Sequence, residues 1–97
     1  MIAGSVAIRP EQRAEATRAA LAMARATCAE PGCISYRFAA DLADPETFLV
    51  FEEWESDEAL ARHFRSEHMR VFREQLPKLV AGAARIARYT VSDKTAM

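Results

Sequence analysis

The sequence is poor in the residues that build common cofactor-binding motifs. Its three glycines, Gly4, Gly32 and Gly82, form neither a phosphate-binding loop nor a dinucleotide-binding fingerprint. No segment approaches the roughly 20 consecutive apolar residues that a membrane span requires. The beginning of the chain also lacks a basic leader followed by an apolar run. We therefore expect a cytoplasmic protein with no membrane partner, to which a flavin or a nicotinamide would have to come as a diffusing substrate.

An excess of charge of one sign is also missing. The 13 basic and 14 acidic residues are interspersed and give a formal charge of −1, so we expect no nucleic-acid partner.

Cysteine is scarce as well. Cys28 and Cys33 lie further apart than the cysteines of a Cys-x-x-Cys redox motif, at the expected end of a helix and start of a strand. We expect both to be buried or half-buried reduced thiols.

The length and composition of the chain predict a single domain. Ninety-seven residues, of which 51% are hydrophobic, suffice for one modest core and are too few for separate catalytic and cofactor domains. We expect this domain to span residues 1–97, with residues 92–97 as a tail.

The first third of the chain predicts a strand followed by a helix. Residues 1–9 are mostly apolar, and Pro10 with Glu11 is typical of a first helical turn. The helix should run to Ala29. Its apolar stripe is expected at the positions that repeat at spacings of three and four, Ala14, Thr17, Leu21, Ala24 and Cys28.

The middle of the chain predicts two strands joined by a polar turn. Pro31-Gly32 ends the helix, residues 34–40 read as a strand, and residues 41–46 form the turn. Residues 47–54 form the clearest strand. Because Phe48 to Phe51 are consecutive apolar residues, both faces of this strand should need cover.

Two helices and a closing strand are expected after it. Ser56, followed by two acids, predicts a helix start, and Ser66 predicts a second one. Pro77 is expected to break the second helix. Residues 84–91 read as the closing strand. The apolar stripe of the second helix is Met69, Phe72, Leu76 and Leu79.

This order of elements predicts an α+β fold. Strand, helix, strand, strand, helical pair and strand suggest the ferredoxin-like split βαβ arrangement, with a four-stranded antiparallel sheet covered by helices on one face. The uncovered face would leave an apolar patch larger than monomers usually expose. We therefore expect a homodimer packed sheet against sheet, a dimeric α+β barrel.

Three motifs in the sequence resemble those of a known family. They are P-G-C-I-S-Y at 31–36, D-P-E-T-F at 44–48 leading to E-E-W at 52–54, and A-L-A-R-H-F at 59–64 followed by S-E-H-M at 66–69. They resemble the antibiotic biosynthesis monooxygenase domain family over most of the chain. The resemblance implies the same fold.

The activities of this family are diverse, so the resemblance leaves the reaction open. It includes oxygenases that oxidise quinols or polycyclic phenols without a metal or prosthetic group, haem-degrading enzymes, isomerases of a phosphorylated signalling molecule, and members without an established reaction. The haem-degrading branch fits less well, because it relies on an asparagine and this sequence has none.

A cofactor-free oxygenase needs a dry pocket for an aromatic hydroxyl compound, a base and room for dioxygen. Tyr36, Trp54, Phe64 and Phe72 are the candidate substrate-binding residues, with Trp54 favoured by its place at a strand end, where the resemblance puts a cavity residue. The alternative for each of these aromatic side chains is that it only fills the core.

His63 and His68 are the candidate catalytic bases, because only histidine titrates near neutral pH without perturbation. The family pattern places a histidine at the position of His63, which we prefer slightly. The alternative for either is a surface or capping histidine near a helix end.

Glu52 and Glu53 point to opposite faces of their strand. An inward carboxylate could act as an acid or base, whereas an ion pair with Arg37, Arg85 or Arg88 is the more ordinary expectation.

The spacing of the histidines and glutamates matches no metal motif. We expect no metal and no cofactor.

The sequence therefore favours a cofactor-independent monooxygenase that oxidises a quinol or related aromatic hydroxyl compound with dioxygen. One alternative is an isomerase or lyase acting on a small polar or phosphorylated metabolite, favoured if a basic side chain points into the cavity. Another is a non-catalytic dimeric ligand-binding module. A cavity collapsed around Trp54, with both histidines in solvent, would favour that module.

Overall fold

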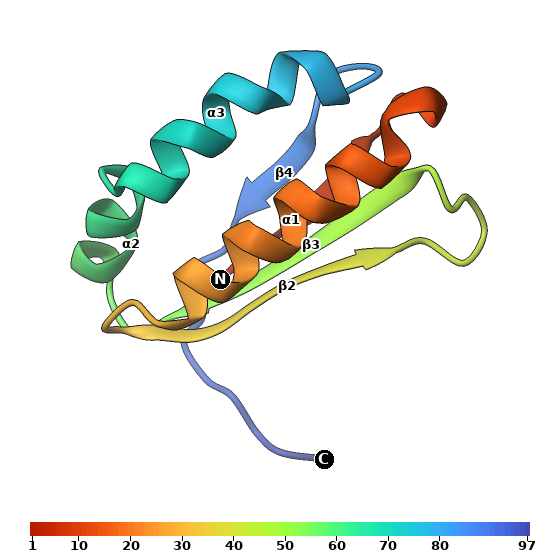
Figure 1. Ribbon diagram of the computed structural model, residues 1–97. Helices are drawn as coiled ribbons and strands as arrows, with labels where there is room; N and C mark the ends of the chain where they lie inside the picture. The colour runs from red at the N-terminus through yellow and green to blue at the C-terminus, as the bar shows by residue number, and fades with distance from the viewer.

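The four strands form one antiparallel sheet whose order is β2-β3-β1-β4. The computed structural model describes residues 1–97. Two long helices lie side by side across one face of the sheet, and the chain end after the last strand lies on the opposite side (Figure 1). The elements are β1 (Ile2–Ala7), a 3-10 turn (Pro10–Gln12), α1 (Arg13–Cys28), β2 (Cys33–Ala40), β3 (Thr47–Trp54), α2 (Asp57–Phe64), α3 (Glu67–Leu79) and β4 (Arg85–Arg88).

The predicted α+β fold and order of elements are confirmed. The bounds of β3 agree with the prediction, and both serine caps form. Ser56 Oγ accepts from the Ala59 N–H at 3.1 Å, and Ser66 Oγ accepts from the Met69 N–H at 3.3 Å. The closing strand is shorter than predicted, since β4 pairs with β1 over Arg85–Arg88 only.

The predicted buried face of α1 is wrong. The residues that pack inward are Ala16, Ala20, Met23 and Thr27, whereas Leu21 is 52% exposed. Cys28 is exposed too, which corrects the expectation of a buried or half-buried thiol, while Cys33 is half-buried as expected and both cysteines are reduced. In an alanine-rich helix, small apolar residues repeat at spacings of three and four on several faces, so the spacing alone does not identify the buried face. The face that lets the backbone approach the sheet is the one that packs.

Pro77 does not break α3, which corrects a second expectation. The helix continues to Leu79, and the Val80 N–H donates to the Leu76 carbonyl at 3.0 Å. Pro77 lies in the last turn, where its missing N–H removes one main-chain hydrogen bond and the packing of the buried Leu79 outweighs that loss.

The sheet has one face under the helices and one uncovered face. Phe48 and Val50 of β3 are buried beneath the helices, in or beside a core that includes Val6 and Ala20. On the uncovered face Leu49 and Phe51 remain 39% and 37% exposed. Both faces of β3 are therefore apolar, as predicted. None of the three α-helices combines the length and apolar character that crossing a bilayer would require.

Candidate functional site

One carboxylate and two imidazoles meet where three helix ends converge. His63, in the last turn of α2, is 1% exposed, and its Nδ1 lies 2.7 Å from a carboxylate oxygen of Glu30. His68, in the first turn of α3, has its Nε2 3.2 Å from the same oxygen. We call Glu30, His63 and His68 the Glu30 cluster. It brings together both predicted bases and a carboxylate that the sequence analysis did not select.

A tight turn places Glu30 beside α2. Gly32 has a φ of +86°, a conformation that glycine adopts without strain. A Cβ at Gly32 would lie 2.5 Å from the Ala59 Cβ, so the backbone of the turn approaches α2 too closely for any other residue. The Gly32 carbonyl also accepts from the Glu55 N–H at 2.9 Å. The Pro31-Gly32 motif therefore fixes the position of the cluster as well as ending α1.

Ser66 holds the two histidines in register. Its hydroxyl donates to the His63 carbonyl at 2.6 Å while accepting from the Met69 N–H. The end of α2 and the start of α3 are thus joined by one side chain. Hydrogen bonds between the Ser66 side chain and the backbone therefore help to position His63 and His68.

Three of the four predicted substrate-binding aromatics surround His63. The ring centroid of His63 lies 4.9 Å from that of Trp54, 5.6 Å from that of Tyr36 and 5.8 Å from that of Phe64. Phe72 lies apart from this group and packs on Phe38 at 5.9 Å. Each of the three rings around His63 therefore packs on the imidazole itself.

Burial and the Glu30 carboxylate act in opposite directions on His63. Burial lowers the pKa of His63, and the hydrogen bond to Glu30 partly opposes this effect. An ionised carboxylate can only accept, so Nδ1 carries the proton in this pair and Nε2 is left with its lone pair. A neutral His63 held in this way has the tautomer of a general base.

His68 differs from His63 in its bonding. Its Nε2 is shielded from solvent and has no hydrogen-bond partner, because the approach to Glu30 has the distance of an ion pair without the angle of a hydrogen bond. The side chain as a whole is 27% exposed. His68 therefore combines an unpaired inner nitrogen with an accessible outer side.

Glu52 forms a different contact from the expected pair with an arginine. It is 7% exposed and accepts from the Trp54 indole N–H at 2.9 Å, while Glu53 pairs with Lys94 at 3.1 Å on the uncovered face. Burial raises the pKa of Glu52. The pKa of Tyr36 is raised too, mainly by burial and then by the Glu52 carboxylate, which lies opposite Tyr36 in the sheet. The expected partners Arg37, Arg85 and Arg88 take neither role.

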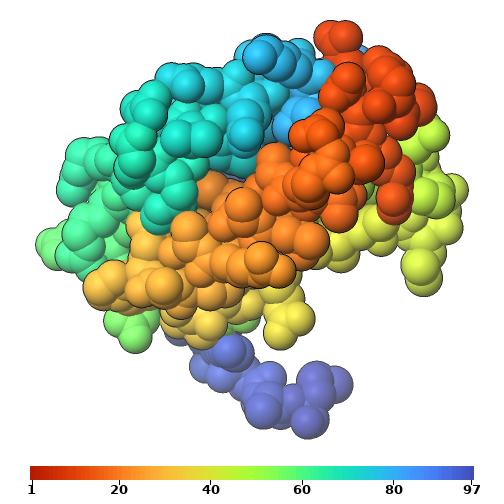
Figure 2. Space-filling model, in the orientation of Figure 1, coloured from red at the N-terminus to blue at the C-terminus, as the bar shows by residue number.

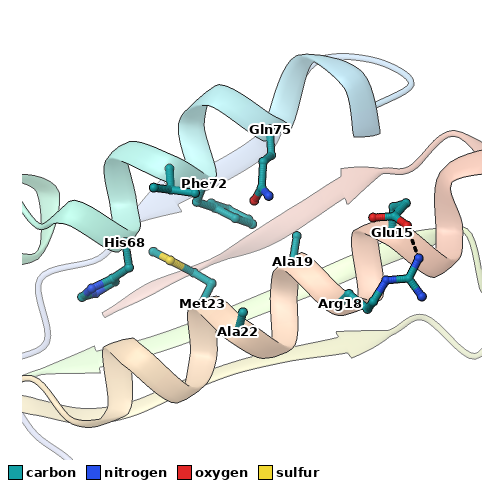
Figure 3. A pocket seen from close by; sticks show the side chains of 9 residues that line it. Glu15, Arg18, Ala19, Ala22, Met23, His68, Phe72 and Gln75 are labelled. Carbon is teal, nitrogen blue, oxygen red and sulfur yellow. Dashed lines mark hydrogen bonds and ion pairs between the residues drawn. The ribbon is translucent and has the colours of Figure 1, made fainter.

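A groove runs between α1 and α3 and reaches the Glu30 cluster at His68. It encloses about 350 Å³, and the space-filling view shows this face hollowed between the two helices (Figure 2). Phe72 and Gln75 point from α3 toward α1, where Ala19 and Ala22 leave room (Figure 3). The Arg18–Glu15 ion pair lies at the other end of the groove.

A second cavity lies on the uncovered face of the sheet. It encloses about 480 Å³ between β3 and the chain end, and Phe51, Trp54, Val91 and Lys94 are among its lining residues. Trp54 therefore borders the His63 group on one side and this cavity on the other. Of the predicted site residues, His68 and Phe72 line the groove between α1 and α3, whereas Trp54 lines the cavity by the chain end.

Glu30 is the residue of the cluster that sequence reasoning missed. It lies one residue beyond the C-cap of α1, at the helix end where the macrodipole disfavours negative charge. An acid at that position implies a compensating positive or hydrogen-donating partner elsewhere in the fold. That local conflict was the available signal.

Comparisons with known proteins agree with this fold. The model of a family described as antibiotic biosynthesis monooxygenase matches residues 1–75, which contain all three sequence motifs of the predicted resemblance. An uncharacterized protein of Synechocystis sp. is 32% identical over 93 residues, which are 96% of this chain. The chain spans only 63% of that relative's length.

Two solved structures have closely similar folds. Rv0793 of Mycobacterium tuberculosis is 25% identical, with a TM-score of 0.90 over 98% of this chain and 96% of its own. A candidate antibiotic biosynthesis monooxygenase from Deinococcus radiodurans is also 25% identical, with a TM-score of 0.90 over 100% of this chain and 98% of its own.

Proposed function

Because the chain belongs to the antibiotic biosynthesis monooxygenase family, we propose that it is a cofactor-independent monooxygenase that oxidises a quinol or related aromatic hydroxyl compound with dioxygen. The observation that carries this proposal is the Glu30 cluster. A partly buried carboxylate shared by two imidazoles, next to Tyr36, Trp54 and Phe64, can accept a proton within a largely apolar environment.

The substrate would bind in the groove between α1 and α3. Phe72 and Met23 offer apolar contacts to an aromatic ring there, and His68 borders the same space. The substrate hydroxyl would face His68, with Tyr36, Trp54 and Phe64 closing the site behind His63. Both histidines keep their candidate catalytic role in this arrangement, His68 as the group nearest the groove and His63 as the second base on the same carboxylate.

Proton removal is the step that the protein would assist. His68 takes the hydroxyl proton, and the Glu30 carboxylate stabilises the imidazolium that results. The electron-rich ring then reduces dioxygen, and a bond forms between a ring carbon and oxygen. Loss of the proton from that carbon and cleavage of the O–O bond give a quinone and water. One oxygen atom enters the product, and the substrate supplies all the electrons.

The proposal includes a homodimer packed through the uncovered face of the sheet. Leu49, Phe51 and Ile34 are 39%, 37% and 55% exposed. A second sheet with the same apolar surface would cover them, as two-fold assemblies do. The cavity beside Trp54 and the chain end would then border the partner subunit.

Oxygen uptake tests the reaction. Metal-stripped protein would be assayed against a panel of quinols and polyphenols, with a His63→Ala, His68→Ala double variant as the control. We expect uptake above autoxidation that the double variant loses. Absence of uptake across the panel, or equal uptake by the double variant, would overturn the proposed reaction.

One observation favours an isomerase or lyase acting on an anionic metabolite instead. Arg18 lines the outer end of the groove, where a phosphate could replace Glu15 as its partner. Arg18→Gln should raise KM for such a substrate with little effect on a neutral quinol. The remaining alternative, a non-catalytic binding module, would be favoured by a cavity collapsed around Trp54 with both histidines in solvent; the burial of His63 does not favour it.

A further inference from the structure

We propose that the Glu30 cluster is also a binding site for one divalent transition-metal ion such as Zn²⁺. The ligand atoms of Glu30, His63 and His68 all lie within 4.8 Å of one another. Two imidazole nitrogens and one carboxylate oxygen are a donor set that Zn²⁺ and neighbouring first-row ions accept, with the remaining position open to water.

The two distances from the histidine nitrogens to the Glu30 oxygen are close to those between ligands of a metal ion. Ligands at about 2.0–2.1 Å from a tetrahedral Zn²⁺ lie about 3.3 Å from one another. His68 Nε2 is already 3.2 Å from the Glu30 oxygen. His63 Nδ1, at 2.7 Å, would have to move away by roughly 0.6 Å while giving up its proton.

The unpaired nitrogen of His68 points to a missing partner. A solvent-shielded polar atom without a hydrogen bond destabilises the fold, and Nε2 of His68 is such an atom. A metal ion would use this lone pair. The ion would also neutralise the charge of the Glu30 carboxylate, whose only hydrogen-bonded partner in the cluster is His63.

The ligands are held by the backbone before any ion arrives. Glu30 follows the end of α1, His63 lies in the last turn of α2 and His68 in the first turn of α3, with Ser66 linking the last two helices. Ligands fixed in this way lose little conformational freedom on binding. The groove beside His68 gives the ion a route from solvent. Sequence spacing cannot reveal this site, because Glu30 is separated from His63 by 33 residues.

The consequence for catalysis rests on the proposed function, whereas the site itself does not. An ion bound to one nitrogen of each neutral imidazole would leave the proton on the other nitrogen, so neither histidine could accept a proton from the substrate. Zn²⁺ should therefore inhibit oxygen uptake, and a chelator should restore it.

A titration with Co²⁺ tests the site without any substrate. Metal-stripped protein should bind one Co²⁺ per chain, with visible d–d bands typical of low coordination number, and Zn²⁺ should displace it. We expect His68→Gln and Glu30→Gln each to weaken binding at least tenfold. Glu67→Gln is the matched control, since it changes an exposed acid on α3 that pairs only with Arg70.

Three results would each overturn the proposal: bands no stronger than for free Co²⁺, binding that survives both cluster substitutions, or thiolate charge-transfer bands that indicate Cys28 or Cys33 as ligands. Circular dichroism of each variant confirms that it is folded. Because the titration involves no turnover, its failure is distinguishable from failure of the oxygen-uptake assay.

Discussion

Removing the Glu30 carboxylate should measurably destabilise the fold, because it leaves the imidazole N–H of His63 without a partner. His63 is 1% exposed and the Glu30 side chain 16%, so water cannot readily replace the carboxylate. An unpaired buried donor costs about 1–3 kcal/mol, which is the loss expected for Glu30→Ala. Glu30→Gln keeps an acceptor and removes only the charge. It should cost about 1 kcal/mol, since hydrogen bonds to charged groups are roughly twice as strong as neutral ones.

Thermal unfolding with a chelator present would measure both losses. In a domain of this size each kcal/mol shifts Tm by about 4–8 °C. Protein concentration must be held fixed, because a dimer would make Tm depend on it. Glu67→Gln serves as the control and should leave Tm unchanged, since its ion pair with Arg70 is exposed. A Glu30→Ala protein as stable as the control would refute the argument that this pair is buried and structural.

Three further predictions concern the sheet. Phe51→Glu should convert the proposed dimer to a monomer of 10.8 kDa in light scattering, and a wild-type protein already at that mass would contradict the dimer. Gly4→Ala should lower the free energy of unfolding by about 1–3 kcal/mol, because its Cβ would lie 2.2 Å from the Arg85 carbonyl oxygen. Gly82→Ala is the control and should be neutral, since no atom lies within 4 Å of its Cβ. Equal effects of the two substitutions would contradict this prediction. Burial holds the pKa of Glu52 above 4.5, so the folded state binds a proton more tightly than the unfolded state, and the free energy of unfolding should fall as pH rises from 4.5 through the raised pKa. Glu52→Gln should flatten this dependence of stability on pH, measured by urea unfolding at several pH values. An unchanged dependence in the variant would assign it to another group.

The parts of the fold that sequence predicted well are those with strong local signals. The run from Phe48 to Phe51 fixes β3, because consecutive apolar residues favour a strand with two covered faces. Ser56 and Ser66 fix the starts of α2 and α3, because each hydroxyl satisfies an otherwise unpaired N–H of its own helix. These interactions are local, so a single sequence contains them.

The errors occurred where local signals are weak or are outweighed by packing. In α1, alanines on several faces give no single stripe, and contact with the sheet selects Ala16 and Ala20 over the larger Leu21. At Pro77 a local rule predicted a break, but packing of the following turn outweighs one lost hydrogen bond. Propensity predicts element existence better than it predicts which face is buried.

The Glu30 cluster follows from helix electrostatics once the topology is known. His63 lies at the carboxyl end of α2, where the macrodipole favours a proton donor or a cation. The Glu30 carboxylate approaches the first turn of α3, where the macrodipole favours an anion. Glu30 is placed unfavourably only with respect to the macrodipole of α1, the helix that it follows.

That one unfavourable placement is informative because the other two helix ends offset it. Glu30 can occupy the carboxyl end of α1 because the Pro31-Gly32 turn carries it to α2 and α3 at the same time. A carboxylate kept against the dipole of its own helix thus identifies the point where the topology supplies compensating groups. In this chain those groups are the two histidines that the sequence had selected separately, which is why the candidate site is best defined by Glu30 and not by either histidine alone.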